Sequence, residues 1–351
     1  MSHQDIELNR AFLDDLLTRG AGWWDEVNFD YGFRQELDAA CDRLVRRAFA
    51  GGDRRALHQL HDVLAAIHDQ DFRAASIERV ACETQPILRD IAAKLERATL
   101  GEELKAVPAA LLASRPERPR EYVPWLTGVI GDHPAASHPF YATTLAKTAT
   151  REDMRFYLAQ ETNLDPRFDD ILALVQIGTA GEEKMEIAAN FWDEMGNGEE
   201  DEVHTALFAE SLRALDVGPA YIAEHLLLEA KVSASLSSCL ALSRRHYYKA
   251  IGFFGVTEYL VPRRFTAFLE GWRRLGLPME AVKYHDLHVR IDAVHASGWF
   301  RNVIAPLVER DPRVGDEIAL GALIRLQSSQ RYLDALLGEV TRRAEGRPSP
   351  R

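Results

Sequence analysis

Residues 284–300 read YHDLHVRIDAVHASGWF, and this stretch carries most of what the chain reveals about its fold. It contains His288, Asp292 and His295 at spacings of four and three residues, so an α-helix would carry all three side chains on one face. Two neutral imidazoles and a carboxylate are the ligand set that holds ferrous iron while leaving coordination positions open. The spacing therefore predicts a helix with one metal-binding face.

The residues around this stripe bear on whether it is a metal site or an ordinary polar face. The alternative is that the three side chains face solvent or hydrogen-bond within the core. His285 lies one residue off the stripe, and for it this alternative is stronger than a role as a ligand. Buried ionisable groups need compensation, which a metal ion supplies. The case for burial rests on the apolar residues along the rest of the circumference, which are Val289, Ile291, Val294, Trp299 and Phe300.

A second stretch, NFWDEMGNGEEDEVHTALF at residues 190–208, offers Glu194 and His204. The two are ten residues apart, which is not a same-face spacing on a straight helix. Gly196 and Gly198 lie between them, and each costs up to ~1 kcal/mol inside a helix, so we expect the helix to be bent or broken there. The alternative is a plain loop between two helices. The neighbouring Asp193 is a candidate for supporting a ligand rather than binding metal itself.

Two further acids are weaker candidates. Glu258 stands in the apolar run AIGFFGVTEYLV, where a lone carboxylate needs a partner. Glu161 stands in YLAQETNL near an expected helix end, and an ordinary surface acid is the competing interpretation.

Composition excludes several classes of protein. The 351 residues carry a net charge of −12, which argues against a nucleic-acid binder and gives no support for an anionic membrane surface as partner. No apolar stretch approaches the ~20 residues that span a bilayer. The first ten residues lack the features of a signal peptide, and the three scattered cysteines form neither a disulfide framework nor a zinc site. A cytoplasmic location is therefore expected.

The pattern of apolar residues predicts an all-α fold. Apolar residues recur every three or four positions in most segments, including residues 33–48, 57–67 and 77–95, and no period-two run with hairpin signals appears. Several of the expected helices are 20 to 30 residues long, which suits a bundle with a metal site in its interior. In the second half of the chain the predicted helices are 138–147, 151–163, 167–177, 181–213, 219–238, 242–260, 263–275, 279–308 and 315–343.

One domain boundary is predicted. Residues 114–124, SRPERPREYVP, are rich in proline and charge and indicate a linker or extended loop. We therefore expect an N-terminal helical domain at residues 1–120 and a larger helical domain at residues 130–345. Trp23, Trp24, Phe29 and Tyr31 form an aromatic cluster in the first domain, which suits either a homodimer surface or packing against the second domain.

Taken together, these motifs resemble the heme-oxygenase-like diiron oxidases and oxygenases, a family of iron-containing redox enzymes. The resemblance covers residues 133–343 and rests on E…(N-x-x-D-E-x-G-x-G…H-x-x-L-F)…E…(Y-x-x-x-H-x-x-x-D-x-x-H). It looks strongest for the diiron domain of the streptozotocin-pathway N-oxygenase and does not extend to that enzyme's cupin domain. The fold it implies is a heme-oxygenase-like helical bundle preceded by a helical segment that serves dimerisation.

The resemblance also implies a ligand set and a cofactor. Four carboxylates would balance two Fe(II) ions, although a Mn/Fe centre stays open. With dioxygen as co-substrate, the centre is expected to form a peroxo-diferric intermediate. The implied ligands are Glu161, Glu194, His204, Glu258, His288, Asp292 and His295.

The activity implied is N-oxygenation of an amine or guanidine group of a small metabolite, with an external electron donor. Related branches of the family instead perform oxidative C–C cleavage or desaturation of amino or fatty acids. A heme oxygenase or cofactorless oxidase is the less suitable enzyme class, because heme needs one proximal histidine rather than this set. The non-enzymatic alternative is a helical metal-binding or interaction protein. For a substrate pocket we considered Arg244 and His246 as polar contacts, with walls from Phe191, Trp192, Phe253, Phe254, Tyr284 and Trp299.

Overall fold

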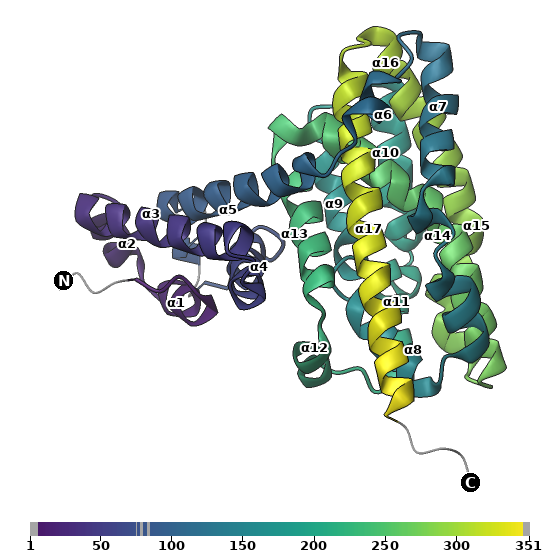
Figure 1. Ribbon diagram of the computed structural model, residues 1–351, viewed down its shortest axis with the longest axis horizontal. Coiled ribbons are helices and arrows are strands. Elements are labelled where there is room, and N and C mark those ends of the chain that lie inside the picture. The colour runs from purple at the N-terminus through teal and green to yellow at the C-terminus, as the bar shows by residue number, and fades with distance from the viewer. Residues whose placement is uncertain (1–5, 75, 78–79, 83–84, 347–351) are drawn as a thin grey trace. The chain divides into compact units, whose positions relative to one another are not determined.

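A computed structural model describes residues 6–74, 76, 77, 80–82 and 85–346. Within these residues the chain is helical and contains no strand, so the predicted all-α class is confirmed (Figure 1). The chain divides into two compact units, one formed by residues 1–106 with 234–239 and the other by residues 107–233 with 240–351. The predicted domains at 1–120 and 130–345 stay a prediction.

The first unit is a cluster of short and medium helices around its own apolar core. Leu13, Trp24, Leu60 and Ile91 are among the side chains that this core buries completely or nearly so. Its α-helices are α1 (Arg10–Leu16), α2 (Ala21–Val27), α3 (Tyr31–Val45), α4 (Arg54–His68) and α5 (Pro86–Lys105), with a π-helical turn at Arg46–Ala50 and a 3-10 turn at Val80–Cys82.

The helix expected over residues 77–95 is wrong in its first part. It begins only at Pro86, whose fixed φ and missing N–H suit the first position of a helix. Ile77 and Val80 are 84% and 53% exposed and contribute nothing to the core. Apolar residues at helical spacing thus lie on both sides of Pro86, but the helix begins only at this proline.

The second unit contains the long helices of the chain. Its α-helices are α6 (Ala109–Ala113), α7 (Pro119–Asp132), α8 (Arg151–Glu161), α9 (Phe168–Val175), α10 (Gly181–Glu194), α11 (His204–Ala214), α12 (Pro219–His225), α13 (Leu228–Leu242), α14 (Tyr247–Arg274), α15 (Lys283–Gly298), α16 (Ala305–Arg310) and α17 (Val314–Glu345). The π-helical turns are Phe140–Thr148 and Trp299–Ile304, and the 3-10 turns are Pro134–Ala136, Asp165–Arg167, Gly196–Gly198, Glu200–Glu202, Arg244–His246 and Met279–Val282. The middle of α13, residues 234–239, belongs to the first unit.

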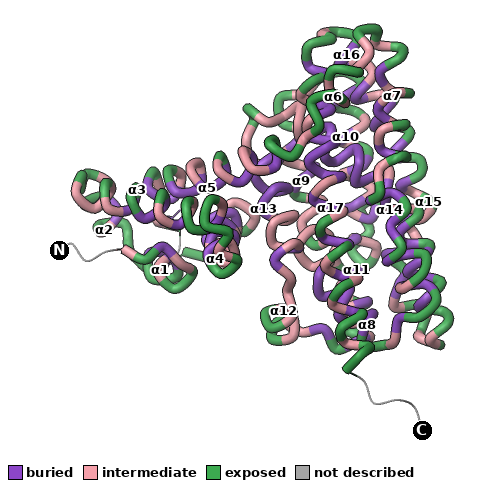
Figure 2. The backbone as a smooth tube through the Cα atoms, in the orientation of Figure 1, coloured by how far each residue is buried: buried purple, intermediate pink, exposed green. Residues whose placement is uncertain are grey.

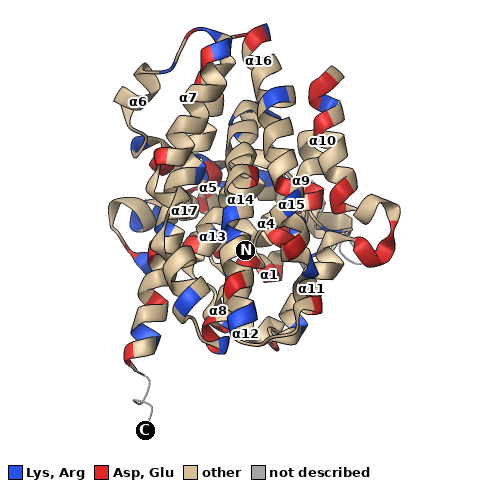
Figure 3. Ribbon diagram, turned by 90° about the vertical axis from the view of Figure 1, so that its right-hand side faces the viewer, with Lys and Arg blue, Asp and Glu red and all other residues tan. Residues whose placement is uncertain are grey.

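Helix α14 is the centre of the second unit. It packs along both α15 and α17, and it is buried over most of its length (Figures 1 and 2). The surrounding core is rich in aromatic rings, including Phe140, Tyr157, Phe268 and Trp272. Acidic and basic residues are interspersed along these helices (Figure 3). The result is a bundle whose interior helices carry the predicted ligand residues.

Prolines explain two further differences from the expected elements. The predicted helices 242–260 and 263–275 form one helix, α14, which continues through Pro262. The predicted loop at 114–124 is helical from Pro119 onward, and α7 also contains Pro124. Burial of Tyr122, whose hydroxyl donates to the Gly315 carbonyl at 2.6 Å, holds this helix in place despite the proline. Tertiary packing therefore outweighs the local cost of proline in both cases.

Two predicted long helices are divided. The span 181–213 is broken at the glycines, because α10 ends at Glu194 and two 3-10 turns lead to α11 at His204, which is also what the alternative of a loop between two helices described. The span 219–238 is interrupted at Leu226 and Leu227, between α12 and α13. The span 279–308 is helical throughout, as a 3-10 turn, α15, a π-helical turn and α16 in direct succession. Within the described part of the chain, no helix combines the length and apolarity that crossing a membrane requires.

Candidate metal centre

Two groups of ligand-type side chains meet inside the second unit. Among the described residues, Glu194, His204 and His288 form one group, and Glu258, Asp292 and His295 form the other. In each group, one candidate ligand atom per residue lies within 4.8 Å of the others. All six residues are buried. Six of the seven side chains singled out from the sequence are therefore brought into two groups, and Glu161 is in neither.

Helix α15 contributes three of the six. His288, Asp292 and His295 are 4%, 3% and 6% exposed, so the face predicted from their spacing is a buried face. Helix α14, which packs along α15, contributes Glu258. The solvated-face alternative for this stripe is therefore wrong.

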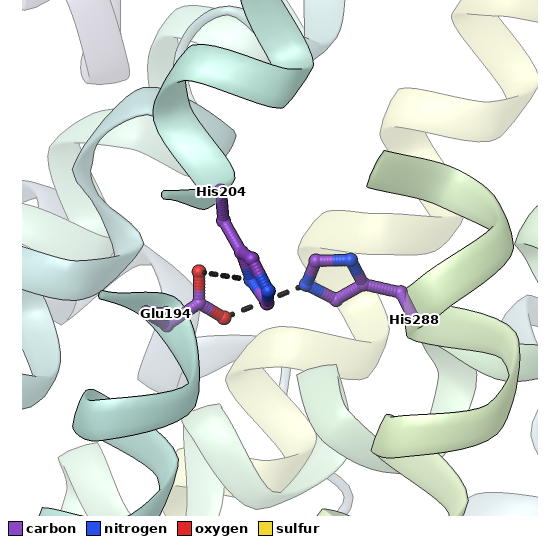
Figure 4. A group of neighbouring side chains, drawn as sticks. All are labelled: Glu194, His204 and His288. Atoms are coloured by element: carbon purple, nitrogen blue, oxygen red, sulfur yellow. Dashed lines mark hydrogen bonds and ion pairs between the residues drawn. The ribbon is translucent and has the colours of Figure 1, made fainter. Parts of the chain in front are cut away.

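The turn between α10 and α11 places Glu194 opposite His204. Gly196 has φ +61°, and a Cβ at this position would lie 2.5 Å from the carbonyl carbon of Glu202. Asn197 also has a positive φ of 54°. Only glycine meets both demands at position 196 without strain. The chain thus reverses tightly, and His204 Nδ1 comes within 2.8 Å of Glu194 Oε2 (Figure 4).

The hydrogen bonds of His288 determine which of its nitrogens is available. Its Nδ1 lies 2.8 Å from the Tyr284 carbonyl, and since a carbonyl only accepts, Nδ1 carries the proton. Its Nε2 points to Glu194 Oε1 at 3.5 Å (Figure 4). In the neutral ring, Nε2 therefore keeps the lone pair that faces the group, which is the arrangement of a metal-binding histidine.

His295 is held in the opposite sense. Its Nε2 lies 2.8 Å from Asp193 Oδ2, while its Nδ1 faces Asp292 Oδ1 at 3.5 Å and Glu258 Oε2 at 3.8 Å. Asp193 thus orients the ring from outside the group, which is the supporting role considered for it from sequence. Carboxylates that hold the outer nitrogen of a histidine in this way are a regular feature of metal sites.

The electrostatics of the groups reflect burial and mutual contact. Burial opposes ionisation of Glu194, but hydrogen bonds with His204 and His288 outweigh it and lower the pKa of Glu194 to about 2. Burial likewise disfavours the charged imidazoles. Asp292 and Glu194 nevertheless raise the pKa of His288 to about 10, and Asp292, Glu258 and Asp193 raise that of His295 to about 9. Glu258 differs, because burial and the nearby Asp292 raise its pKa well above the usual range.

These residues fit a pair of iron ions. Glu258 Oε1 is buried and has no hydrogen-bond partner, an arrangement that is costly unless something else binds the oxygen. The donor set of imidazoles and carboxylates, without thiolates, suits non-heme iron. Burying so many ionisable groups together is unfavourable without a cation to compensate them.

Glu161 lies close to the groups but is engaged elsewhere. The Tyr332 hydroxyl donates to Glu161 Oε1 at 2.5 Å. Burial raises the pKa of Glu161, while this hydrogen bond and the charges of Arg264 and Arg325 oppose the rise. The structure therefore surrounds Glu161 with a phenol and two guanidinium groups rather than with histidines.

Asp165 is a residue that sequence reasoning missed. A small cavity of about 30 Å³ is lined by Asp165 and by members of both groups, namely His288, Glu258 and Asp292. Asp165 Oδ2 is buried and has no hydrogen-bond partner. Burial and Glu161 raise the pKa of Asp165 well above its usual range. Asp165 follows Glu161 by four residues, but α8 ends at Glu161 and Asp165 opens a 3-10 turn, so helical spacing carried no signal for it.

The other predicted pocket residues have different roles. Of the six aromatic residues considered, Tyr284 lines the cavity. Trp192 is 52% exposed, and Trp299 is a core residue whose Nε1 donates to the Ile251 carbonyl at 2.9 Å. Arg244 donates to the carbonyls of Leu174 and Val175. His285 is a buried core residue whose ring is stacked on that of Phe268, with the ring centroids 4.1 Å apart, and it is in neither group.

The fold and the site define an all-helical protein with two adjacent buried groups of histidines and carboxylates. Residues 155–330 match the sequence profile of the iron-containing redox enzymes, and the chain belongs to that family. This stretch contains all six grouped residues. A comparison with curated proteins gives no match.

Proposed function

We propose that this protein is a non-heme diiron oxygenase that N-oxygenates an amine or guanidine group of a small metabolite. The observation that carries the proposal is the pair of adjacent buried groups, Glu194 with His204 and His288, and Glu258 with Asp292 and His295. Each group would hold one metal ion. Two ferrous ions bound there would supply the chemistry of dioxygen activation.

The residues of the chain prepare the site. The Tyr284 carbonyl keeps His288 in the tautomer that presents Nε2, and Asp193 holds His295 so that Nδ1 faces its group. The walls of the cavity include the apolar side chains Phe168, Val261 and Phe265, which exclude bulk water. Excluding water strengthens the electrostatic interactions inside the site.

The choice of an amine or guanidine substrate rests on the resemblance of the motifs to the N-oxygenases. Asp165, Glu258 and Asp292 line the cavity together with His288. Metal ions bound there would engage these carboxylates, so the substrate class follows from the resemblance and not from the charge of the lining. At about 30 Å³ the cavity accommodates a water-sized molecule, so a metabolite enters only when neighbouring side chains move.

The chemistry also requires a reductant. Converting an N–H group to N–OH consumes dioxygen, two electrons and two protons, and releases one water molecule. We therefore include an external electron donor in the proposal. Oxidative C–C cleavage or desaturation of an amino or fatty acid is the alternative reaction, a Mn/Fe pair is the alternative centre, and a metal-binding protein without catalysis is the alternative class.

A homodimer in the cytoplasm is part of the same proposal. In the first unit, Phe29 and Tyr31 are 77% and 79% exposed, as a contact surface requires. Trp24, by contrast, is fully buried in the core of that unit. The predicted aromatic cluster is therefore divided between core and surface.

The test is metal uptake followed by oxygen consumption. Protein is loaded anaerobically with ferrous iron, desalted and analysed for iron, then supplied with reductant, oxygen and a panel of amines, guanidines and fatty acids. We expect two ions per chain and substrate-dependent oxygen uptake with nitrogen compounds. His288→Ala and Glu194→Ala are expected to lose the ion of their group and the substrate-dependent oxygen uptake, and His225→Ala, a histidine outside the two groups, is the control. Folded protein that takes up no iron would exclude the diiron function.

A further inference from the structure

We propose that Asp165 supplies the fourth carboxylate of the metal centre, and that Glu161 instead serves as the counter-charge of two buried arginines. The inference rests on the proposed diiron function. It assigns to Asp165 the role that the family resemblance implies for Glu161. The juxtaposition that carries it is a cavity with Asp165 on one wall and members of both metal groups on the others.

Asp165 has the position and the free oxygen that a ligand needs. It opens the 3-10 turn Asp165–Arg167, directly after α8, and lines the cavity with His288 of one group and Glu258 and Asp292 of the other. Asp165 Oδ2 is buried without a hydrogen-bond partner, as is Glu258 Oε1. Asp165 is in neither of the two close groups, but it lines the same cavity as Glu258, and each has a buried oxygen without a partner. Such oxygens are unfavourable unless a cation binds them.

Glu161 has other partners to satisfy. Its Oε1 accepts the short hydrogen bond from Tyr332, and its charge interacts with both Arg264 and Arg325. Glu161, Tyr332, Arg264 and Arg325 thus form a polar cluster, and none of the four lines the cavity. Moving Glu161 to a metal ion would break the tyrosine contact and remove a negative charge from the neighbourhood of both guanidinium groups.

The two arginines are buried and interact with Glu161. Arg264 and Arg325 are 9% and 7% exposed, and the charge of each interacts with that of Glu161, while Arg325 also interacts with Asp165. Arg264 donates to Ser329 Oγ at 2.6 Å, and its Nε has no partner. Arg325 donates to Thr257 Oγ1 and Ser233 Oγ, both at 3.0 Å. Buried cations that donate to neutral acceptors depend on a carboxylate in their surroundings, and Glu161 is the one that interacts with both.

Charge balance points the same way. With neutral imidazoles, the two groups provide three carboxylates, those of Glu194, Glu258 and Asp292. Two ferrous ions would then retain one uncompensated positive charge. A fourth carboxylate from Asp165 makes the occupied site neutral without removing the counter-charge of the arginines.

The experiment compares Asp165→Asn with Glu161→Gln in the full-length protein. Anaerobic titration calorimetry with ferrous iron gives stoichiometry and affinity, and thermal unfolding of the metal-free protein gives stability. Asp170→Asn, which changes an acid on α9 that does not line the cavity, is the control. Asp165→Glu keeps a carboxylate at this position. It tests whether a carboxylate there is enough to restore binding of the second ion in a protein that folds.

We expect Asp165→Asn to bind one ion normally and the other at least about tenfold more weakly, with Asp165→Glu restoring the second. We expect Glu161→Gln to bind two ions and to unfold at lower temperature. The assignment is overturned if Asp165→Asn binds two ions with unchanged affinity, or if Glu161→Gln is the variant that loses an ion. Failure of the wild type to bind iron would instead overturn the proposed function.

Discussion

At the scale of single residues, the candidate centre depends on the hydrogen bond that orients each histidine ring through the nitrogen facing away from the group. His288 is fixed by a backbone carbonyl one helical turn earlier, which substitution cannot remove. His295 is fixed by a side chain, Asp193. The two metal groups therefore differ in how vulnerable their ring orientation is to mutation.

Asp193→Ala should weaken iron binding at the group of Glu258, Asp292 and His295. Removing the contact at His295 Nε2 frees the ring, and loss of such a partner lowers metal affinity by about 10- to 100-fold. Calorimetric titration would measure the loss, with the other group unaffected. Asp193→Asn retains an acceptor oxygen and is the matched control. Equal affinity in the alanine variant would show that Asp193 does not orient the ring.

Cys41 should be unreactive toward thiol reagents in the native protein. Burial, with Asp42 adding to it, raises the pKa of its thiol from 9.0 to about 12, and the side chain is 1% exposed. The pKa of the Cys41 thiol is therefore higher in the folded protein than in the unfolded chain. Burial of the neutral thiol contributes fully to stability below pH 9, and this contribution is lost as pH rises toward 12. Titration with a chromogenic disulfide before and after denaturation would test this. Rapid labelling of Cys41 in folded protein would contradict it.

At the scale of the elements, the contact between α14 and α17 is built on glycines. A Cβ at Gly252 would lie 1.9 Å from the Ile318 carbonyl oxygen, and one at Gly321 would lie 1.9 Å from that of Lys249. The two helices therefore touch backbone to backbone. Because α14 carries Glu258, this contact also determines where one metal group stands.

Gly252→Ala should destabilise the protein by about 1–3 kcal/mol or more, because the methyl group forces the helices apart. Gly338→Ala on α17, the helix that Gly252 contacts, is the control. Nothing lies within 4 Å of its Cβ position, so helix propensity should make it neutral or stabilising by up to about 1 kcal/mol. Denaturant unfolding measures both. Similar stabilities for the two variants would mean that the backbones of α14 and α17 are far enough apart to accommodate a methyl group at position 252.

Gly196→Ala should abolish iron binding by the group of Glu194, His204 and His288. The substitution meets both an unfavourable φ and a clash with the Glu202 backbone, so the turn between α10 and α11 must open. Gly276→Ala has a similar φ of +66° in open surroundings, so it should cost about 1–2 kcal/mol and keep both metal ions. Iron content after desalting distinguishes the two. Full iron content in Gly196→Ala would show that the turn is not needed.

At the scale of the whole molecule, iron binding should stabilise the second unit selectively. All six grouped residues belong to it, and a ligand stabilises the state that binds it by about 2.7 kcal/mol at a concentration of 100 Kd. Hydrogen exchange with and without ferrous iron should show slower exchange in α10, α11 and α15 and little change in α1–α4. Protection spread equally over both units would contradict a site confined to the second.

The sequence by itself determined the fold class and most of the ligand-type residues that the candidate site brings together. The four- and three-residue spacings of α15 translate directly into one buried face, because the helical period is a local property of the backbone. The Gly-Asn-Gly break between Glu194 and His204 was also readable, because the need for positive φ is local. Family membership follows from the same motifs.

Only the tertiary structure decided which side chains meet. Glu161 and Asp165 are four residues apart and both acidic, yet Glu161 accepts from Tyr332 and interacts with two arginines while Asp165 lines the cavity. Continuity of α14 through Pro262 likewise depends on packing against α15 and α17. The local sequence pattern specifies where helices form, which residues share a helix face, and where the chain turns. Which carboxylate is left for a metal depends on what distant segments place beside it, since a buried charge must be compensated by whatever lies nearest in space.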